Sequence, residues 1–136
     1  SLDTRGMSVR NAILKANKAQ VDAGAFDAAT LVVNRGGLPN VTGFTASLTT
    51  AGASFTATWT KPAATNITEK AVLVVVAVDA TAKVAVASSA LLSAESITVT
   101  MPLTAGNKVD CYYYVIDYRG SSRVGSVNGY ATGTPA

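Results

Sequence analysis

The chain has 136 residues, a formal net charge of +3, no histidine and one cysteine, and 49% of its residues are hydrophobic while only 14% are charged. This length and composition are typical of one globular domain. The lack of histidine excludes Ser-His-Asp and Cys-His catalytic arrangements and removes the commonest zinc ligand. The longest apolar run, residues 71–78, is too short for a membrane helix. We therefore expect no enzyme, no cofactor, no metal site and no membrane span.

The N-terminal segment carries all of the net charge. Residues 1–18 hold four bases and one acid, whereas the rest of the chain holds seven bases and seven acids. Apolar residues at helical spacing predict one amphipathic helix over residues 7–21, so we expect a basic helical unit over residues 1–27. Its bases are a candidate contact for an anionic partner, namely Arg5, Arg10, Lys15 and Lys18. A solvated helix face accounts for the same pattern, and we favour it over a nucleic-acid contact.

From residue 28 onward, β-branched residues replace helix formers, and turn residues recur about every eight to twelve positions. This spacing predicts a second unit, residues 28–136, folded as an all-β sandwich of seven or eight strands. We expect the strands at residues 30–34, 41–49, 54–60, 71–79, 83–88, 96–101, 109–118 and 123–132. Cys111 is single, so it forms no intrachain disulfide, and we expect it to fill the core.

Two stretches resemble the fibronectin type III pattern, residues 54–62 (SFTATWTKP) and 101–115 (MPLTAGNKVDCYYYV). Trp59 precedes Pro62, and Leu103 leads through Gly106 into a strand, as in that family. The chain departs from the family at Val109, where a tyrosine is usual. The resemblance implies an Ig-like or fibronectin type III-like sandwich.

Residues 9–132 also resemble the C-terminal portion of an uncharacterised bacterial family, a domain of unknown function. The resembling stretches include LVVNRGGLP at residues 31–39 and VNGYA at residues 127–131. This second resemblance implies an Ig-like fold and adds no chemistry.

Two of the expected strands are apolar on both faces. Residues 71–78 read AVLVVVAV, and residues 109–118 read VDCYYYVIDY. In a fibronectin-like register the two strands are neighbours, and odd-numbered residues from 109 to 115 point into the core. The outer face then carries a candidate interaction surface made of Tyr112, Tyr114, Ile116 and Tyr118.

An apolar outer face of this kind needs a cover. The protein's own helix is one candidate, and a partner surface is the other, because tyrosine is enriched at interfaces. The partner would be a second copy of the chain or a glycan stacked on the rings. We favour a second copy, because a glycan site also needs converging polar groups and only Asp110 is evident on that face.

These observations predict a non-catalytic structural protein, an Ig-like building block that self-associates in a virion or extracellular assembly such as a phage particle or a surface filament. We expect it outside the cell, at the cell surface or on a virion. The alternative is an adhesion or recognition module that binds a glycan, or another surface or virion protein, through the tyrosines.

Overall fold

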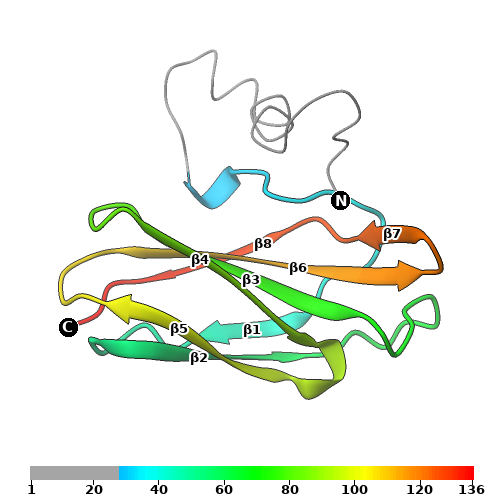
Figure 1. Ribbon diagram of the computed structural model, residues 1–136, viewed down its shortest axis with the longest axis horizontal. Helices are drawn as coiled ribbons and strands as arrows, with labels where there is room; N and C mark the ends of the chain where they lie inside the picture. Colours follow the sequence, from blue (N-terminus) through cyan, green and yellow to red (C-terminus); the bar gives the residue numbers. More distant parts are fainter. Residues whose placement is uncertain (1–27) are drawn as a thin grey trace, which may run out of the picture.

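The computed structural model describes residues 28–136, so the helix expected over residues 7–21 lies outside the described part of the chain. Eight strands and two short 3-10 helices follow one another along the described residues (Figure 1). Their order is η1 (Ala28–Thr30), β1 (Thr42–Ala46), β2 (Gly52–Thr60), β3 (Val72–Asp79), β4 (Val84–Leu91), η2 (Leu92–Ala94), β5 (Ser96–Leu103), β6 (Val109–Arg119), β7 (Ser122–Gly125) and β8 (Gly129–Gly133).

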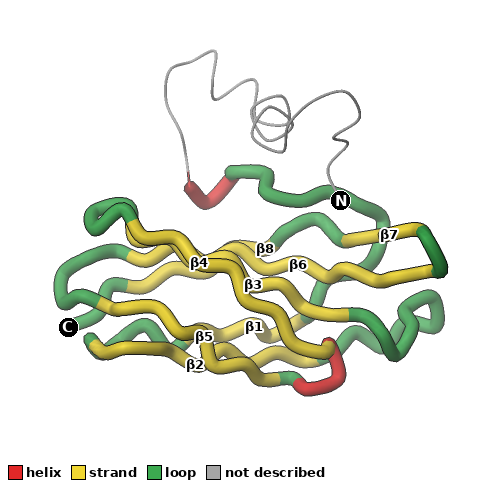
Figure 2. Tube along the Cα trace, in the orientation of Figure 1, coloured by secondary structure: helices red, strands yellow, loops and turns green. Residues whose placement is uncertain are grey.

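The strands form two antiparallel sheets that pack as layers (Figure 2). One sheet has three strands in the order β1-β2-β5. The other has five strands, in which β4, β3, β6 and β7 are successive neighbours and β8 also pairs with β6. This arrangement is an antiparallel β-sandwich, and it confirms the predicted all-β fold.

The core lies between the two sheets and is built from alternate residues of the central strands. Its buried members include Phe55, Ala57, Trp59, Leu73, Val75, Ala77, Val99, Met101, Val109, Cys111 and Val115. The indole Nε1 of Trp59 donates a hydrogen bond to the carbonyl of Leu92 at 2.9 Å, so this large ring is buried with its polar group satisfied.

Cys111 fills the core as predicted, and its thiol is free and buried. Burial raises the pKa of this thiol to about 12, and the neighbouring carboxylate of Asp110 acts in the same direction. The thiol therefore stays protonated near neutral pH and serves as a packing group.

Two strand predictions were wrong. Residues 31–34 form no strand, because the backbone N–H groups of Val33 and Asn34 donate to the side-chain oxygen of Asn128 rather than to a neighbouring strand. The last strand, expected over residues 123–132, is split into β7 and β8. At the break, the N–H of Val115 in β6 donates to the side-chain Oγ of Ser126 at 2.8 Å and not to a backbone carbonyl of a paired strand.

The backbone of Gly129 lies directly against the ring of Tyr113. The ring of Tyr113 stacks on that of Phe44 with centroids 3.9 Å apart. A Cβ atom added at Gly129 would lie 2.2 Å from Cζ of Tyr113, which is far inside van der Waals contact. The stacked pair therefore requires glycine at this position.

We expect Gly129→Ala to lower the free energy of unfolding by about 1–3 kcal/mol, because the Tyr113 ring must leave its stack to make room. Chemical denaturation followed by tryptophan fluorescence measures the change. Gly52→Ala in β2 is the matched control, because nothing lies within 4 Å of its added Cβ atom, and we expect it to change stability by no more than about 0.5 kcal/mol. Equal losses in the two variants would contradict this prediction.

Candidate interaction surface

The outer face of the five-stranded sheet is set by the pairing of β3 with β6. The two strands pair at eight successive positions, from Val72 opposite Ile116 to Asp79 opposite Val109. Because side chains alternate, the even-numbered residues of both strands lie on the side away from the core. β4 adds its own odd-numbered residues to this side. This outer face comprises Val72, Val74, Val76, Val78, Ala85, Ala87, Ser89, Leu91, Asp110, Tyr112, Tyr114 and Ile116.

The four residues of the expected interaction surface lie at alternate positions of β6, and their exposure differs widely. Tyr112 is 4% exposed and Ile116 is 1% exposed, whereas Tyr114 is half-buried and Tyr118 is 43% exposed. Among these four, Tyr118 alone presents much of its side chain to solvent. The other expected contact, formed by Arg5, Arg10, Lys15 and Lys18, lies outside the described residues.

Tyr112 has an aromatic neighbour on another strand, which the pattern of its own strand does not indicate. The ring of Tyr130 in β8 lies with its centroid 5.5 Å from that of Tyr112, tilted by 48°. The Tyr130 hydroxyl donates a hydrogen bond to the carboxylate of Asp110. Lys108 Nζ lies 3.6 Å from the same carboxylate, which raises the pKa of Lys108. The acid on this face is therefore already engaged by neighbouring side chains.

At the other end of β6, Tyr118 faces Arg123 of β7. The guanidinium carbon of Arg123 lies 5.9 Å from the centroid of the Tyr118 ring, within the range of a cation–π contact. Burial raises the pKa of the Tyr114 hydroxyl, and the nearby charge of Arg123 opposes that rise only in part. Tyr114 thus presents a neutral phenol to the outer face.

Three asparagines hold residues 31–40 against the edge of the five-stranded sheet, a role that no motif in the sequence indicates. The side-chain oxygen of Asn128 accepts from the N–H of Val33 at 2.7 Å, and Asn34 Nδ2 donates to the carbonyl of Ser126 at 2.8 Å. Asn40 Nδ2 donates to the carbonyl of Tyr113 at 3.0 Å. The approach is close enough that a Cβ atom at Gly36 would overlap the carbonyl of Gly125.

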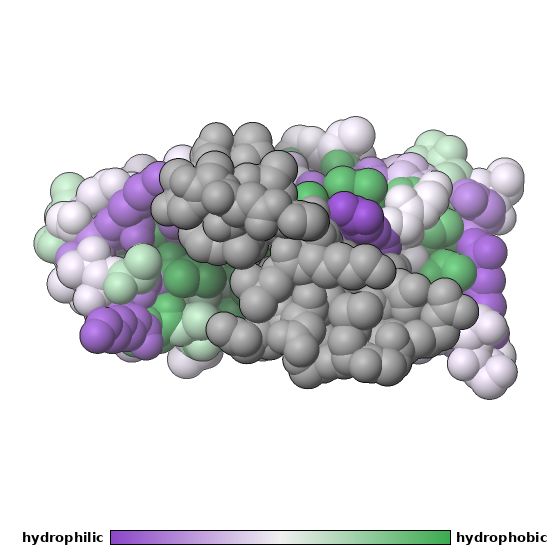
Figure 3. Space-filling model, turned by 90° about the horizontal axis from the view of Figure 1, so that it is seen from above, coloured by the Kyte–Doolittle hydropathy of each residue, from purple (hydrophilic) through white to green (hydrophobic). Residues whose placement is uncertain are grey.

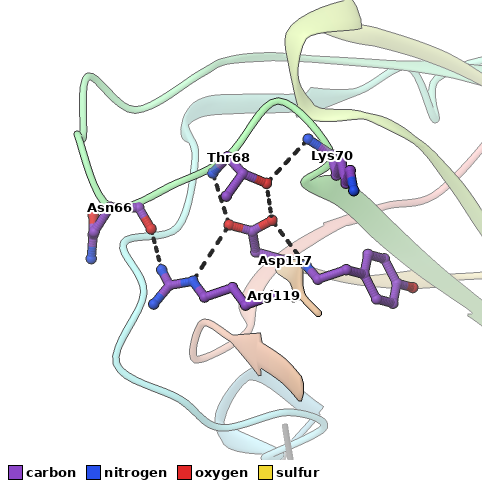
Figure 4. A network of polar contacts seen from close by, with 6 residues as sticks. Asn66, Thr68, Lys70, Asp117 and Arg119 are labelled. Carbon is purple, nitrogen blue, oxygen red and sulfur yellow. Dashed lines mark hydrogen bonds and ion pairs between the residues drawn. The ribbon is translucent and has the colours of Figure 1, made fainter. Parts of the chain in front are cut away.

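Asp117 anchors the loop that precedes β3 (Figure 4). Its buried carboxylate accepts hydrogen bonds from the N–H of Thr68 at 2.8 Å, the Thr68 hydroxyl at 2.6 Å and the N–H of Tyr118 at 2.9 Å. Arg119 Nε lies 3.9 Å from the carboxylate, and its Nη2 donates to the carbonyl of Asn66. Burial favours the neutral acid, but these donors outweigh it and lower the pKa of Asp117. The carboxylate is a structural anchor.

Within residues 28–136, no group of three or more His, Cys, Asp or Glu side chains is placed to hold a metal ion. Over the same range, no helix is both long and apolar enough to cross a membrane.

The fold of the described residues is an antiparallel β-sandwich of two sheets. No protein-family model matches the chain, and no curated protein matches it. Among solved structures it is similar to the fn3 domain of the human collagen alpha-1(XX) chain, with 16% sequence identity, a TM-score of 0.47, and coverage of 76% of this chain and 87% of that one. These comparisons provide no evidence for the uncharacterised bacterial family, which stays a prediction.

The lowered pKa of Asp117 predicts a loss of stability in acid. A carboxyl whose pKa is lower in the folded chain stabilises the fold above its unfolded pKa, about 3.8, and this contribution disappears as the pH falls through the folded pKa. We expect Asp117→Asn to be less stable than the wild type at neutral pH. As the pH falls below about 4, we expect the variant to lose less of its stability than the wild type does, because it has no carboxylate to protonate at this position. Urea unfolding at a series of pH values measures both effects.

Glu69→Gln is the control, because Glu69 is exposed in the same loop. We expect this variant to follow the wild-type acid profile. An Asp117→Asn profile that runs parallel to the wild type at every pH would contradict the assignment.

Proposed function

We propose that this protein is a non-catalytic structural module whose copies self-associate through the five-stranded sheet. The observation that carries the proposal is the composition of the outer face. Four valines of β3 and Tyr114 of β6 lie there, partly accessible and side by side, and Leu91 of β4 is 53% exposed. Hydrophobic residues are visible on this side of the molecule in Figure 3. Contiguous apolar patches on a protein surface mark interaction sites.

The chemistry of the outer face favours a protein partner over a glycan. Its valines and Tyr114 provide apolar contact area. Its one acid, Asp110, already accepts a hydrogen bond from Tyr130 and forms an ion pair with Lys108. Sugar recognition depends on polar groups that converge on the ligand. A second copy of the chain needs only a matching apolar surface, and a two-fold arrangement supplies one without a further component.

The proposed setting is extracellular, either at the cell surface or in a virion or filament. Sandwiches of the fibronectin type III kind are frequent in cell-surface proteins. The equal numbers of acids and bases from residue 19 onward also suit a repeated building block, because this part of each copy adds nothing to the long-range repulsion between copies.

Light scattering of the full chain over a wide range of concentrations tests the proposal. We expect the mean mass to rise with concentration, and we expect added salt not to weaken the association, since the contact is apolar. Tyr114→Ser should raise the dissociation constant about fivefold or more by removing buried aromatic area. A strict monomer at the highest attainable concentration would overturn the proposal.

Two results would redirect the assignment. An association that salt abolishes would point to the N-terminal bases Arg5, Arg10, Lys15 and Lys18 in place of the outer face. A monomer that binds a glycan array, and loses that binding when Tyr112 and Tyr114 are changed to Ala, would establish the recognition module instead.

A further inference from the structure

The edge of the five-stranded sheet formed by β4 is complete and regular. β4 pairs with β3 at eight successive positions, from Val84 opposite Asp79 to Leu91 opposite Val72, without a register shift. β4 is the terminal strand on its side of the sheet. In an antiparallel strand, the N–H and C=O groups of alternate residues point away from the paired neighbour. Half of the β4 backbone groups therefore face outward from the sheet.

These outward groups have no protein partner in the described structure. The backbone hydrogen bonds outside the regular strand pairs include none to residues 84–91, and the first one beyond β4 joins the N–H of Leu92 to the carbonyl of Ala71. No side-chain hydrogen bond of the described residues reaches β4 either. An edge with this row of donors and acceptors is a template for another strand.

The other sheet edges in the described part of the chain are interrupted or covered. β1 has five residues and a register irregularity between Thr42 and Thr45. β5 pairs regularly with β2 at only five successive positions, and beyond them the register shifts and Pro102 has no N–H to donate. The edge formed by β7 and β8 is broken at Ser126, which forms bridges with Gly37 and Leu38. β4 is the long edge that lacks such protection.

The sequence of β4 also lacks the residues that protect exposed edges. The strand reads VAVASSAL, with no charge, proline or glycine. Natural edge strands are usually guarded by lysine, proline or bulges. The outer-face side chains of β4 are small along most of its length, at Ala85, Ala87 and Ser89, so another strand meets little steric resistance beside them.

We propose that a second copy of this chain pairs with β4 along this edge, antiparallel, strand β4 against strand β4, so that the two five-stranded sheets become one continuous sheet. This inference rests on the proposed self-association and adds to it a second contact, at the sheet edge beside the outer face. The main-chain hydrogen bonds supply the register, and the outer faces of the two copies join into one longer apolar surface. A two-fold axis through the contact closes the pair, which is the commonest symmetry of homodimers.

The alternation of side chains restricts the register of this pairing. A two-fold axis perpendicular to the sheet keeps both outer faces on the same side, so outer-face residues of one copy lie opposite outer-face residues of the other. If the axis passes beside Ala87, the Ala87 residues of the two copies lie directly opposite each other. If it passes beside Ser88, Ala87 of one copy lies opposite Ser89 of the other. In either register the two copies of Ala87 are direct or diagonal cross-strand neighbours, and like charges there are repulsive.

The test places charges at Ala87, which is exposed in the monomer. We expect Ala87→Lys and Ala87→Glu each to raise the dissociation constant of the full-length chain about fivefold or more, as measured by sedimentation. An equimolar mixture of the two variants should associate within about twofold of the wild type, because opposite charges then face each other. This recovery cannot arise if either variant merely fails to fold.

Thr98→Lys on the β5 edge and Thr56→Lys in the central strand β2 are matched controls at exposed strand positions. Both should associate like the wild type. If the wild type associates but the Ala87 variants do so equally well, or if Thr98→Lys abolishes association, pairing through β4 is wrong while self-association stands. A wild type that stays monomeric overturns both proposals.

Discussion

The pairing of β3 with β6 is the constraint on which the rest of the structure depends. Eight uninterrupted residue pairs join these two strands, and each strand supplies the core on one side and the outer face on the other. A slip of one residue would exchange the two sides. Because both strands are apolar at most positions, the outward side stays apolar even in the correct register. The candidate surface is thus a direct consequence of the pairing that builds the core.

The remaining strands differ in how they end the two sheets. On one side, β7 and β8 form a broken strand that is further covered by residues 31–40, whose backbone and side-chain groups bond to Asn128 and Ser126. On the other side, β4 is continuous and uncharged. The sheet therefore has one closed edge and one open edge, and the open edge adjoins the apolar outer face. Because of this asymmetry, the proposed pairing of two copies takes place at the β4 edge and not at the β7–β8 edge.

Buried polar groups in the described part of the chain anchor loops. Asp117 holds the loop before β3, and Asp79 accepts a hydrogen bond from the N–H of Ala82 in the turn after it. In the described part of the chain, every buried side-chain nitrogen or oxygen has a hydrogen-bond partner. Satisfied groups of this kind stabilise the fold, because a buried polar atom without a partner is costly. Unpaired backbone groups lie instead at sheet edges, and β4 is the longest regular edge of the described residues.

The sequence by itself determined the sandwich, the two-sided apolar strands and the core position of Cys111, because alternation and turn residues are local signals. It also placed Tyr112, Tyr114 and Tyr118 on one side of a single strand. Only the tertiary structure decided how far each side chain is exposed, since burial depends on residues distant in the chain, such as Tyr130. The tertiary structure also decided that residues 31–34 form no strand. Asn128, almost a hundred positions away, accepts the hydrogen bonds of the backbone N–H groups that a strand would have used.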